Sequence, residues 1–250
     1  MEAPLFSIIT ITFNAADVLR YTLQSVVQQS CTDFEHLIID GASRDDTVAI
    51  AREEGVEGIK IYSEPDKGLY DAMNKGIARA TGRYLIFLNA GDAFATPHSL
   101  KRLADAAIAN PDIIYGQTQL VDATRTVVGM RHLTAPKELT ADSFKHGMLV
   151  CHQAFVARRA IVPTYDLTYR FSADYDWCIR CLQRSQRNAY VGDAPLISYL
   201  TDGLTDRNHR ASLRERYRIM CRYYGTLPTM LRHLAFLLRH LKMRIGRKLR

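Results

Sequence analysis

The sequence has no apolar run approaching the roughly 20 residues that a membrane-spanning helix requires. Its opening stretch, MEAPLFSIITITFN, contains Glu2 and lacks the basic residues that begin a signal peptide. Neither insertion into a membrane nor export is therefore expected, and the sequence predicts a protein of the cytoplasm.

Cysteine is scarce, with five residues in 250, and their odd number and scattered positions argue against a disulfide framework. Cys178 and Cys181 form a C-x-x-C pattern, but they stand inside DYDWCIRCLQR, which has a helical pattern. A zinc site needs two further ligands at a suitable spacing, and none accompanies this pair. We expect two buried cysteines on a helix.

Outside its C-terminal segment, the chain has no excess charge of either sign. The net charge is +7, and residues 232–250 hold seven Lys and Arg with no Asp or Glu. Without this segment, 26 basic residues face 26 acidic ones. The positive excess is therefore interpreted as a property of the C-terminal segment and not of a basic face across the fold.

What the sequence does contain is an alternation of strand-like and helix-like segments, in a composition that is ordinary for a globular domain. Apolar and β-branched runs predict strands at residues 5–12, 34–40, 58–63, 83–89 and 112–116. Apolar residues at helical spacing predict helices between the first two strands and at residues 69–82 and 97–109. Single helices between strands imply right-handed crossovers, so we expect an α/β fold with a mostly parallel central sheet and helices on both faces. Residues 117–130 predict a hairpin turned at Asp122-Ala123-Thr124.

Polar, turn-forming residues follow four of the predicted strands. They are TFNAAD (12–17), DGASRDDT (40–47), EPDKG (64–68) and NAGD (89–92). Each could serve only as a turn, because Asp, Asn and Gly turn well. In open parallel sheets, however, ligands bind outside the carboxyl ends of the strands. Four such segments in succession favour a polar, ligand-binding crevice at this edge.

At these residues the chain resembles the family-2 glycosyltransferases, which have the GT-A nucleotide-sugar fold. The resemblance covers about residues 5–205. Its motifs are SIITITFNAADVLRYTLQSVVQQS, LIIDGASRDDT, DAMNKGIARATGRYLIFLNAGD and YRFSADYDWCIRCL. It implies a GT-A domain over residues 1–205, and a helical, basic extension follows over residues 206–250.

The resemblance implies an inverting transfer of a sugar from a nucleotide-diphosphate sugar to a saccharide acceptor. The expected nucleotide is UDP, and the expected acceptor is lipid-linked and belongs to bacterial surface polysaccharide synthesis. Family members usually carry two or three acidic residues where this chain has Asn89, Gly91 and Asp92. Asp92 is expected to hold a divalent ion, Mn²⁺ or Mg²⁺, because one carboxylate with substrate phosphates and water can suffice. The alternative is that Asp92 caps the next helix or closes a turn.

The resemblance also places the donor along the strand ends. Asp40 is expected to accept a hydrogen bond from a ring N–H of the base, and an Asx-turn to Ser43 is compatible with this role. Where the family often has Arg-Asn, this chain has Met73-Asn74, so Lys75 is a candidate for the missing contact. The expected donor-binding residues are Thr12, Phe13, Asn14, Asp40, Asp66, Lys67, Gly68, Asn74, Lys75, Asn89, Ala90 and Gly91.

Two aspartates stand in ADYDWCIR. On a helix Asp174 and Asp176 diverge by about 200°, so they should not share one task. The resemblance assigns the catalytic base to Asp174, while Asp176 takes a supporting or capping role. The alternative is that both only favour the helix N-terminus through its dipole. His152, Gln153 and Asp176 are the candidates for the acceptor side.

The C-terminal segment carries one apolar stripe among basic residues, formed by Leu231, Leu234, Leu238, Leu241, Ile245 and Leu249. This pattern fits an anionic membrane surface, so residues 229–250 are expected to bind the inner face of the cytoplasmic membrane. The alternatives are docking on the domain or on a partner. Nucleic acid is not expected as a partner, because the segment offers only Phe236 for stacking.

Three other functions remain open at this point. A nucleotidyltransferase would need a glycine-rich phosphate loop after the first strand, and TFNAADVLR lacks one. A non-catalytic nucleotide-sugar-binding scaffold is compatible with the reduced NAGD motif. A nucleic-acid binder would depend on the basic C-terminal segment.

Overall fold

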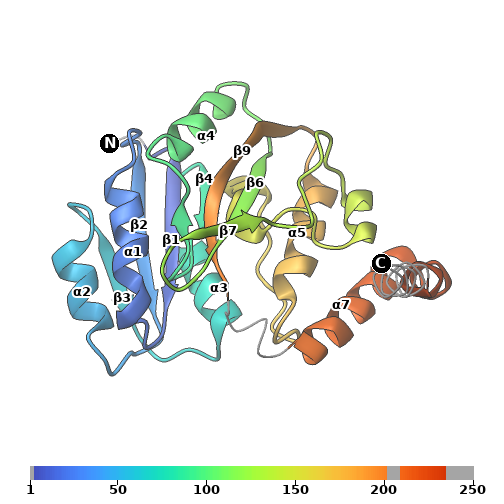
Figure 1. Cartoon of the computed structure of the whole chain (residues 1–250), viewed down its shortest axis with the longest axis horizontal. Helices are drawn as coiled ribbons and strands as arrows, with labels where there is room; N and C mark the ends of the chain where they lie inside the picture. The colour runs from blue at the N-terminus through green and yellow to red at the C-terminus, as the bar shows by residue number, and fades with distance from the viewer. Residues whose placement is uncertain (1–2, 202–208, 235–250) are drawn as a thin grey trace, which may run out of the picture.

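One nine-stranded sheet forms the centre of the part of the chain that this computed structural model describes, residues 3–201 and 209–234 (Figure 1). The strands are β1 (Phe6–Thr12), β2 (Phe34–Asp40), β3 (Lys60–Ser63), β4 (Tyr84–Phe87), β5 (Ala93–Phe94), β6 (Ile113–Val121), β7 (Val127–Met130), β8 (Phe155–Arg158) and β9 (Asn188–Leu200). Their order across the sheet is β3-β2-β1-β4-β8-β6-β9-β5, with β7 paired to β6.

The first four strands of this order are parallel, as the alternation of strands and helices predicts. Beyond β4 the sheet is mixed, because β8 runs antiparallel to both β4 and β6, while β6 and β9 are parallel. The predicted hairpin is confirmed as β6 and β7. Its turn is closed by Asp122, whose side chain accepts hydrogen bonds from the backbone N–H groups of Thr124 and Thr126.

Helices cover both faces of the sheet, as expected (Figure 1). They are α1 (Ala16–Val27), α2 (Thr47–Glu54), α3 (Leu69–Arg79), α4 (Ser99–Ala107), α5 (Ala173–Arg184) and α7 (His209–Tyr224), with 3-10 turns η1 (Ala141–His146), η2 (His152–Ala154) and η3 (Arg159–Ile161). On α1, Leu19, Leu23 and Val26 are buried as their spacing predicts, whereas Val27 is exposed. Cys178 and Cys181 are buried, free cysteines on α5, which confirms that prediction.

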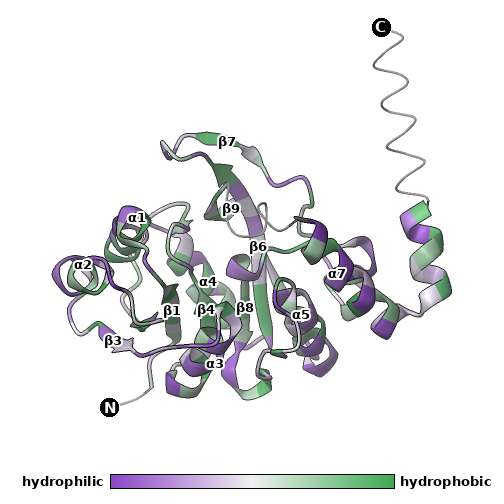
Figure 2. Cartoon of the chain, turned by 90° about the horizontal axis from the view of Figure 1, so that it is seen from below, coloured by the Kyte–Doolittle hydropathy of each residue, from purple (hydrophilic) through white to green (hydrophobic). Residues whose placement is uncertain are grey.

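A second helix, over residues 226–234, follows α7 after a break at Gly225, whose φ is +83°. Both views place α7 at the end of the molecule farthest from α2 (Figures 1 and 2). The predicted boundary at residue 205 and most of the predicted apolar stripe lie outside the described residues. Among the residues that are described, no helix combines the length and the apolar character needed to cross a bilayer.

Aromatic rings join α3 and α5 to the sheet. The rings of Tyr165 and Trp177 stack with their centroids 5.0 Å apart, and Tyr70 stacks on the other side of Tyr165 at 5.4 Å. Phe87 of β4 and Phe155 of β8 meet Trp177 edge-on. Rings in these geometries contribute more than their buried area alone. The stack therefore fixes the start of α5 relative to α3 and β4.

Glu35 bonds several elements at the edge of the sheet where the parallel strands begin. Its Oε1 accepts hydrogen bonds from Ser7 Oγ at 2.6 Å and from Thr81 N and Oγ1 at 2.6 and 2.8 Å, and its Oε2 pairs with Lys60 at 2.7 Å. Burial opposes the charged form, but the hydrogen bonds from Lys60, Ser7 and Thr81 outweigh it and bring the pKa of Glu35 down to about 2. The ionised side chain thus ties β2 to β1, to β3 and to the segment before β4.

Replacing Glu35 by Gln should therefore lower the free energy of unfolding at pH 7 by about 2 kcal/mol, because hydrogen bonds to a charged group are lost. The folded pKa is depressed, so the contribution is full above the ordinary value of 4.5 and is lost as the pH falls towards 2. Urea unfolding at pH 7 and pH 3 should show the difference between wild type and Glu35→Gln shrinking at the lower pH. Glu53→Gln, on the exposed surface of α2, is the matched control; an equal effect of the two variants would contradict the assignment.

Candidate active site

The carboxyl ends of β1, β2 and β3 meet at one edge, as the parallel pairing requires. The loops after β1 and β2 are bonded to each other: Asn14 N donates to Ser43 Oγ at 2.8 Å, and Arg44 N donates to Asn14 Oδ1 at 2.9 Å. Asn14 and Ala42 both adopt left-handed backbone conformations, with φ of 46° and 61°. The two loops therefore form one braced rim, in which the main chain of Asn14 bonds the Ser43 side chain and the side chain of Asn14 bonds the Arg44 backbone.

Phe13, Gly41 and Asp66 come together on this rim. A Cβ atom placed on Gly41 would lie 2.5 Å from Asp66 Oδ2 and 3.2 Å from Phe13 Cδ2, so any larger residue there would displace the Asp66 carboxylate. Phe13 is 64% exposed, and its ring is free to stack with a ligand. Asp66 uses Oδ1 to accept Gly68 N at 2.7 Å, while its Oδ2 has no hydrogen bond within the described chain. A planar group with an N–H donor could be held between these residues.

The carboxylate of Asp40 is already occupied by the protein. It accepts hydrogen bonds from Thr12 Oγ1 at 2.9 Å, Ser63 Oγ at 2.7 Å, and Ser43 N and Oγ at 2.9 and 2.5 Å. Burial opposes ionisation, but these bonds outweigh it and lower the pKa of Asp40. The Asx-turn to Ser43 is thus present. Four bonds use the acceptor sites of a carboxylate, which leaves Asp40 little capacity for the predicted contact with a base.

Asn74 and Lys75 brace the neighbouring loops. The side-chain amide of Asn74 donates to Tyr165 O at 3.0 Å and accepts from Tyr165 N at 2.6 Å, so both of its polar atoms are used. Lys75 Nζ donates to Pro65 O at 2.6 Å and lies 3.5 Å from Glu64. Both contacts hold the segments on either side of α3. Lys67 is exposed, and Gly68, with φ of +116°, begins α3.

Asp92 lies in the turn that follows β4, together with Asn89, Ala90 and Gly91. Its carboxylate is 5% exposed and accepts hydrogen bonds from Gln153 Nε2 at 2.6 Å and from Leu200 N at 3.0 Å. Burial raises the pKa of Asp92 to about 6, although both hydrogen bonds oppose the rise. The segment after the turn is the short strand β5, and the carboxylate bonds no helix N–H group. The alternative of a helix cap is therefore wrong for this residue.

Asp174 lies in the first turn of α5, with its side chain 14% exposed. Its Oδ1 accepts hydrogen bonds from Tyr70 Oη at 3.2 Å and Tyr175 N at 2.9 Å, and its Oδ2 lies 3.5 Å from His152 Nδ1. Burial again opposes the charged form, but the interactions with His152, Arg216 and the Tyr175 N–H outweigh it and lower the pKa of Asp174. The carboxylate is thus held ionised at neutral pH, as a proton acceptor must be.

The turn η2 joins these two acids. His152 faces Asp174 with Nδ1, and its Nε2 lies 3.3 Å from Asn89 Nδ2 in the turn after β4. The next residue, Gln153, donates to Asp92. An Nδ1–H tautomer of His152 would donate to Asp174 and accept from the Asn89 amide. Two consecutive side chains therefore connect Asn89 and Asp92 with Asp174, and all five residues belong to one cluster.

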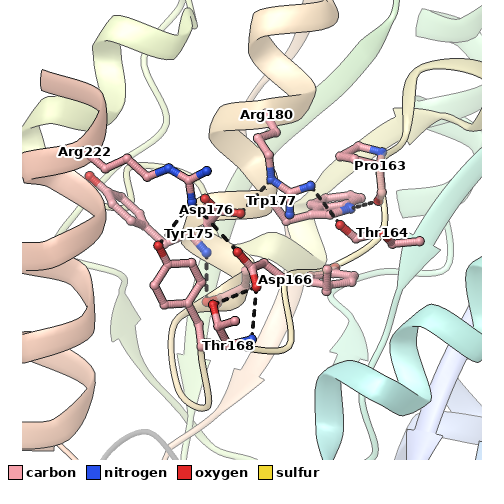
Figure 3. Close-up of polar contacts among 12 residues, drawn as sticks. Pro163, Thr164, Asp166, Thr168, Tyr175, Asp176, Trp177, Arg180 and Arg222 are labelled. Atoms are coloured by element: carbon pink, nitrogen blue, oxygen red, sulfur yellow. Dashed lines mark hydrogen bonds and ion pairs between the residues drawn. The ribbon is translucent and has the colours of Figure 1, made fainter.

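Asp176 is not part of this cluster. Its fully buried carboxylate pairs with Arg180 Nε at 2.6 Å and accepts from Tyr223 Oη at 2.7 Å (Figure 3). The contact with Tyr223 joins α5 to α7, the pair with Arg180 lies within α5, and the buried carboxylate is not accessible to a substrate. The expected divergence of Asp174 and Asp176 is therefore present, and the place of Asp176 on the acceptor side is corrected to a supporting role between helices.

Two contacts of the site were not found from the sequence. Tyr70 was not a candidate in the sequence analysis, and its hydroxyl reaches Asp174 across 104 positions of the chain. Arg125, at the tip of the β6–β7 hairpin, donates to Gly91 O at 2.7 Å and lies 4.2 Å from the centre of the Tyr21 ring. No local pattern signals either contact, because both depend on how distant elements pack.

The protein supplies only part of the ligands that a metal ion would need at this site. No group of three or more His, Cys, Asp or Glu suited to a metal occurs within the described residues. Asp92 uses one acceptor site on each oxygen and keeps the others, and Asn89 Oδ1 is buried without a hydrogen-bond partner in the described chain. Two side-chain oxygens of one turn fit a hard divalent ion that takes its other ligands from phosphate and water.

Comparison with known proteins agrees with this architecture. Residues 7–165 match the family model described as glycosyl transferase family 2. Over 190 residues the chain is 39% identical to the PGL/p-HBAD biosynthesis glycosyltransferase of Mycobacterium tuberculosis. The alignment covers 72% of this chain and 71% of the relative. It is 31% identical over 159 residues to TuaG of Bacillus subtilis, named for teichuronic acid biosynthesis, covering 62% of this chain and 63% of TuaG.

Solved structures share the fold at low sequence identity. The crystal structure of S. aureus TarS 1-349 superposes with a TM-score of 0.68 at 15% identity, covering 92% of this chain and 72% of TarS 1-349. The mannosyltransferase PcManGT from Pyrobaculum calidifontis, in complex with GDP-Man and Mn²⁺, gives 0.58 at 16% identity over 89% of this chain and 65% of its own. The expected GT-A fold is thereby confirmed.

Replacing Gln153 by Leu should lower the free energy of unfolding by about 1–3 kcal/mol, because Asp92 loses a buried hydrogen bond. It should also raise the pKa of Asp92 above its wild-type value of about 6, since that bond favours the charged form. Because the folded pKa of Asp92 is raised, the free energy of unfolding falls as the pH rises through that pKa. The variant has the higher pKa, so its loss of stability relative to wild type should grow between pH 5.5 and pH 8. Urea unfolding at both values measures it. In an Asp92→Asn background the growth should vanish, and its persistence there would place the effect elsewhere.

Proposed function

The chain belongs to glycosyl transferase family 2, and from that premise we propose that it moves a sugar from a UDP-sugar to a saccharide acceptor with inversion at the anomeric carbon. The observation that carries this proposal is the cluster in which η2 connects Asp92 with Asp174. In this proposal Asp92 would face the departing diphosphate, and Asp174 is a carboxylate that can receive a proton.

Asp174 is the proposed base. Its lowered pKa keeps it ionised, and Tyr70, the Tyr175 N–H and His152 fix its orientation. It would accept the proton of the acceptor hydroxyl as that oxygen attacks the anomeric carbon from the side opposite the diphosphate. A single displacement of this kind inverts the configuration, and a positioned base contributes about 10²–10⁴ in rate.

Asp66, rather than Asp40, is the proposed acceptor for the N–H of the base. Its Oδ2 is available beside Phe13 and Gly41. The carboxylate of Asp40, by contrast, already accepts hydrogen bonds from Thr12, Ser43 and Ser63. Phe13 would stack on the ring. UDP is favoured over other nucleotides because TarS structures in complex with UDP and UDP-GlcNAc share this fold, although the PcManGT complex contains GDP-Man.

The metal would be held by Asp92 and Asn89 on the turn after β4. A bound divalent ion supplies positive charge that stabilises the diphosphate as its negative charge develops. The protein's own part is to keep Asp92 in place through Gln153 and Leu200 N. The complex of PcManGT with Mn²⁺ supports this assignment by its fold.

We propose that the protein acts in the synthesis of a bacterial surface polysaccharide or glycolipid. The proposed acceptor of the sugar is lipid-linked. The names of the relatives in PGL/p-HBAD and teichuronic acid biosynthesis support this placement. Family membership also favours a transferase over the nucleotidyltransferase and the non-catalytic scaffold that the sequence left open.

A donor screen tests the function. The full-length protein is incubated with a panel of UDP-sugars and GDP-mannose, with and without Mn²⁺, while binding is followed by thermal shift and nucleotide release by a coupled assay. UDP compounds should stabilise the protein more with Mn²⁺ than without it, and Asp66→Ala should weaken their binding while Glu57→Ala, at an exposed position outside the donor site, serves as the control. Stabilisation by GDP-mannose alone would overturn the UDP assignment, and binding without any nucleotide release would favour a scaffold.

Replacing Asp174 by Asn should reduce transfer by about 10²–10⁴ while donor binding is retained, because the amide keeps the shape and cannot take the proton. Single-turnover transfer and donor affinity are measured on the same preparation. Asp176→Asn serves as a control, since it should lower stability without a comparable loss of the transfer rate per folded molecule. An Asp174→Asn variant as fast as wild type would refute the base assignment.

We also propose that the C-terminal segment binds an anionic membrane surface at the inner face of the cytoplasmic membrane. In the helix over residues 226–234, Leu227, Met230, Leu231 and Leu234 are all exposed, so the described part of this helix does not dock that stripe on the domain. Figure 2 shows the helix standing at the outer end of the molecule. An exposed apolar stripe that continues into seven basic residues suits anionic lipid.

Replacing Leu227 and Leu231 by Asp in the full chain should release the protein from vesicles of phosphatidylcholine with phosphatidylglycerol, because two exposed apolar side chains leave the interface. Co-sedimentation measures it. Leu213→Asp, at an exposed position of α7 outside the stripe, is the control. Unchanged sedimentation of the double variant would contradict a membrane role for this helix.

A further inference from the structure

A cavity lies at the other edge of the sheet, where β4 begins. It has a volume of about 410 Å³ and is lined by Ala3, Thr81, Arg83, Arg158, Arg159 and Ala160. Three of these six residues are arginines, and no acidic residue lines the cavity. Because β4 ends at the turn that carries Asp92, this cavity lies at the opposite end of the strand from the candidate active site.

The three arginines have little compensating charge. Arg158 pairs with Asp112, which is buried and also accepts Gln186 N and Arg187 N. Arg83 donates to the neutral amide oxygen of Asn110, and Arg159 Nε donates to the carbonyl oxygen of Gly82 at 3.0 Å. Neither Arg83 nor Arg159 makes an ion pair within the described chain. The nearby acid Glu35 is taken up by Lys60 and Thr81.

One donor of the cluster is buried and unused. Arg158 Nε is inaccessible to solvent and has no hydrogen-bond partner in the described residues. Because solvent does not reach this atom, a ligand in the cavity does not reach it either, and the exposed guanidinium groups of Arg83 and Arg159 are the available donors. Guanidinium groups bind phosphate oxygens with a matching fork of donors.

The backbone holds the cluster in a fixed arrangement. Tyr84 and Arg158 are paired residues of the antiparallel strands β4 and β8, Arg159 N donates to Arg83 O at 2.8 Å, and Arg158 N donates to Asp112 O at 2.8 Å. Like charges brought together on a rigid frame repel one another unless an anion lies between them. The positive excess of the chain still belongs to the C-terminal segment, and these three arginines are a local grouping in a chain body without net charge.

We propose that this cavity, the arginine pocket, binds a phosphate group of an anionic ligand. The pocket is open to solvent, so it can take a phosphate that is part of a larger molecule as well as a free ion. The shared chemistry is a phosphate oxyanion held by Arg83, Arg158 and Arg159, and two sources can present it: a soluble phosphate compound and the headgroup of a phospholipid. The pocket is separate from the donor site and does not depend on the function proposed above.

The test uses the full-length protein with Arg83 and Arg159 both replaced by Gln, because Arg158 is needed for its pair with Asp112. A second variant with Lys at both positions keeps the charge and loses the fork. The matched control replaces Arg52 and Arg218 by Gln; both are exposed, and neither makes a hydrogen bond in the described residues. The basic C-terminal segment is identical in every protein, so its contribution cancels.

Binding of inorganic phosphate and of pyrophosphate is measured by isothermal titration calorimetry at constant ionic strength, without divalent metal. Affinity should fall about tenfold or more in the Gln variant relative to wild type and control, with the Lys variant between them. In the second arm, co-sedimentation with vesicles of phosphatidylcholine alone or with phosphatidic acid should show whether the Gln variant loses lipid binding. Loss in the first arm identifies a soluble ligand, and loss only in the second identifies a headgroup. If the Gln variant equals the control in both arms, the pocket does not bind phosphate.

Discussion

The attachment of two distant acids to one short turn is the constraint on which the candidate site depends. Asp92 follows β4, and Asp174 lies in the first turn of α5. Neither carboxylate bonds the element that carries the other acid. His152 and Gln153, consecutive in η2, reach one acid each. A buried carboxylate needs partners for its oxygens, so η2 is held by the same bonds that it provides.

The two acids differ in pKa because their neighbours differ. Burial raises the pKa of Asp92 to about 6, because it outweighs the hydrogen bonds from the Leu200 N–H and the Gln153 amide and the electrostatic effect of His152 and Arg125. Asp174 lies near His152 and Arg216 and accepts a backbone N–H, and these together overcome burial and lower its pKa. One carboxylate is thus suited to a positive ligand that it lacks within the protein, and the other to a proton that it does not yet carry.

Strand β4 connects two polar regions of the molecule. Its carboxyl end leads into Asn89 and Asp92, and its first residue, Tyr84, pairs with Arg158 beside the arginine pocket. Its four residues are fully buried, and the aromatic stack of Tyr70, Tyr165 and Trp177 packs on Phe87 near the active-site end. A strand so enclosed cannot shift at one end alone. The fold therefore presents both regions on a single rigid element.

The sequence by itself determined the parallel half of the sheet, the positions of the main helices and the edge at which polar residues gather. It did so because apolar periodicity and turn residues are local signals, and the family motifs extend them in order along the chain. It also separated Asp174 from Asp176, since helical geometry alone sends their side chains in different directions. Only the tertiary structure decided that Tyr70 and His152 would meet Asp174, that Asp40 would be consumed by Thr12, Ser43 and Ser63, and that three arginines would surround one cavity. These contacts join residues many positions apart, and their energies depend on burial and on shared partners that no local pattern records.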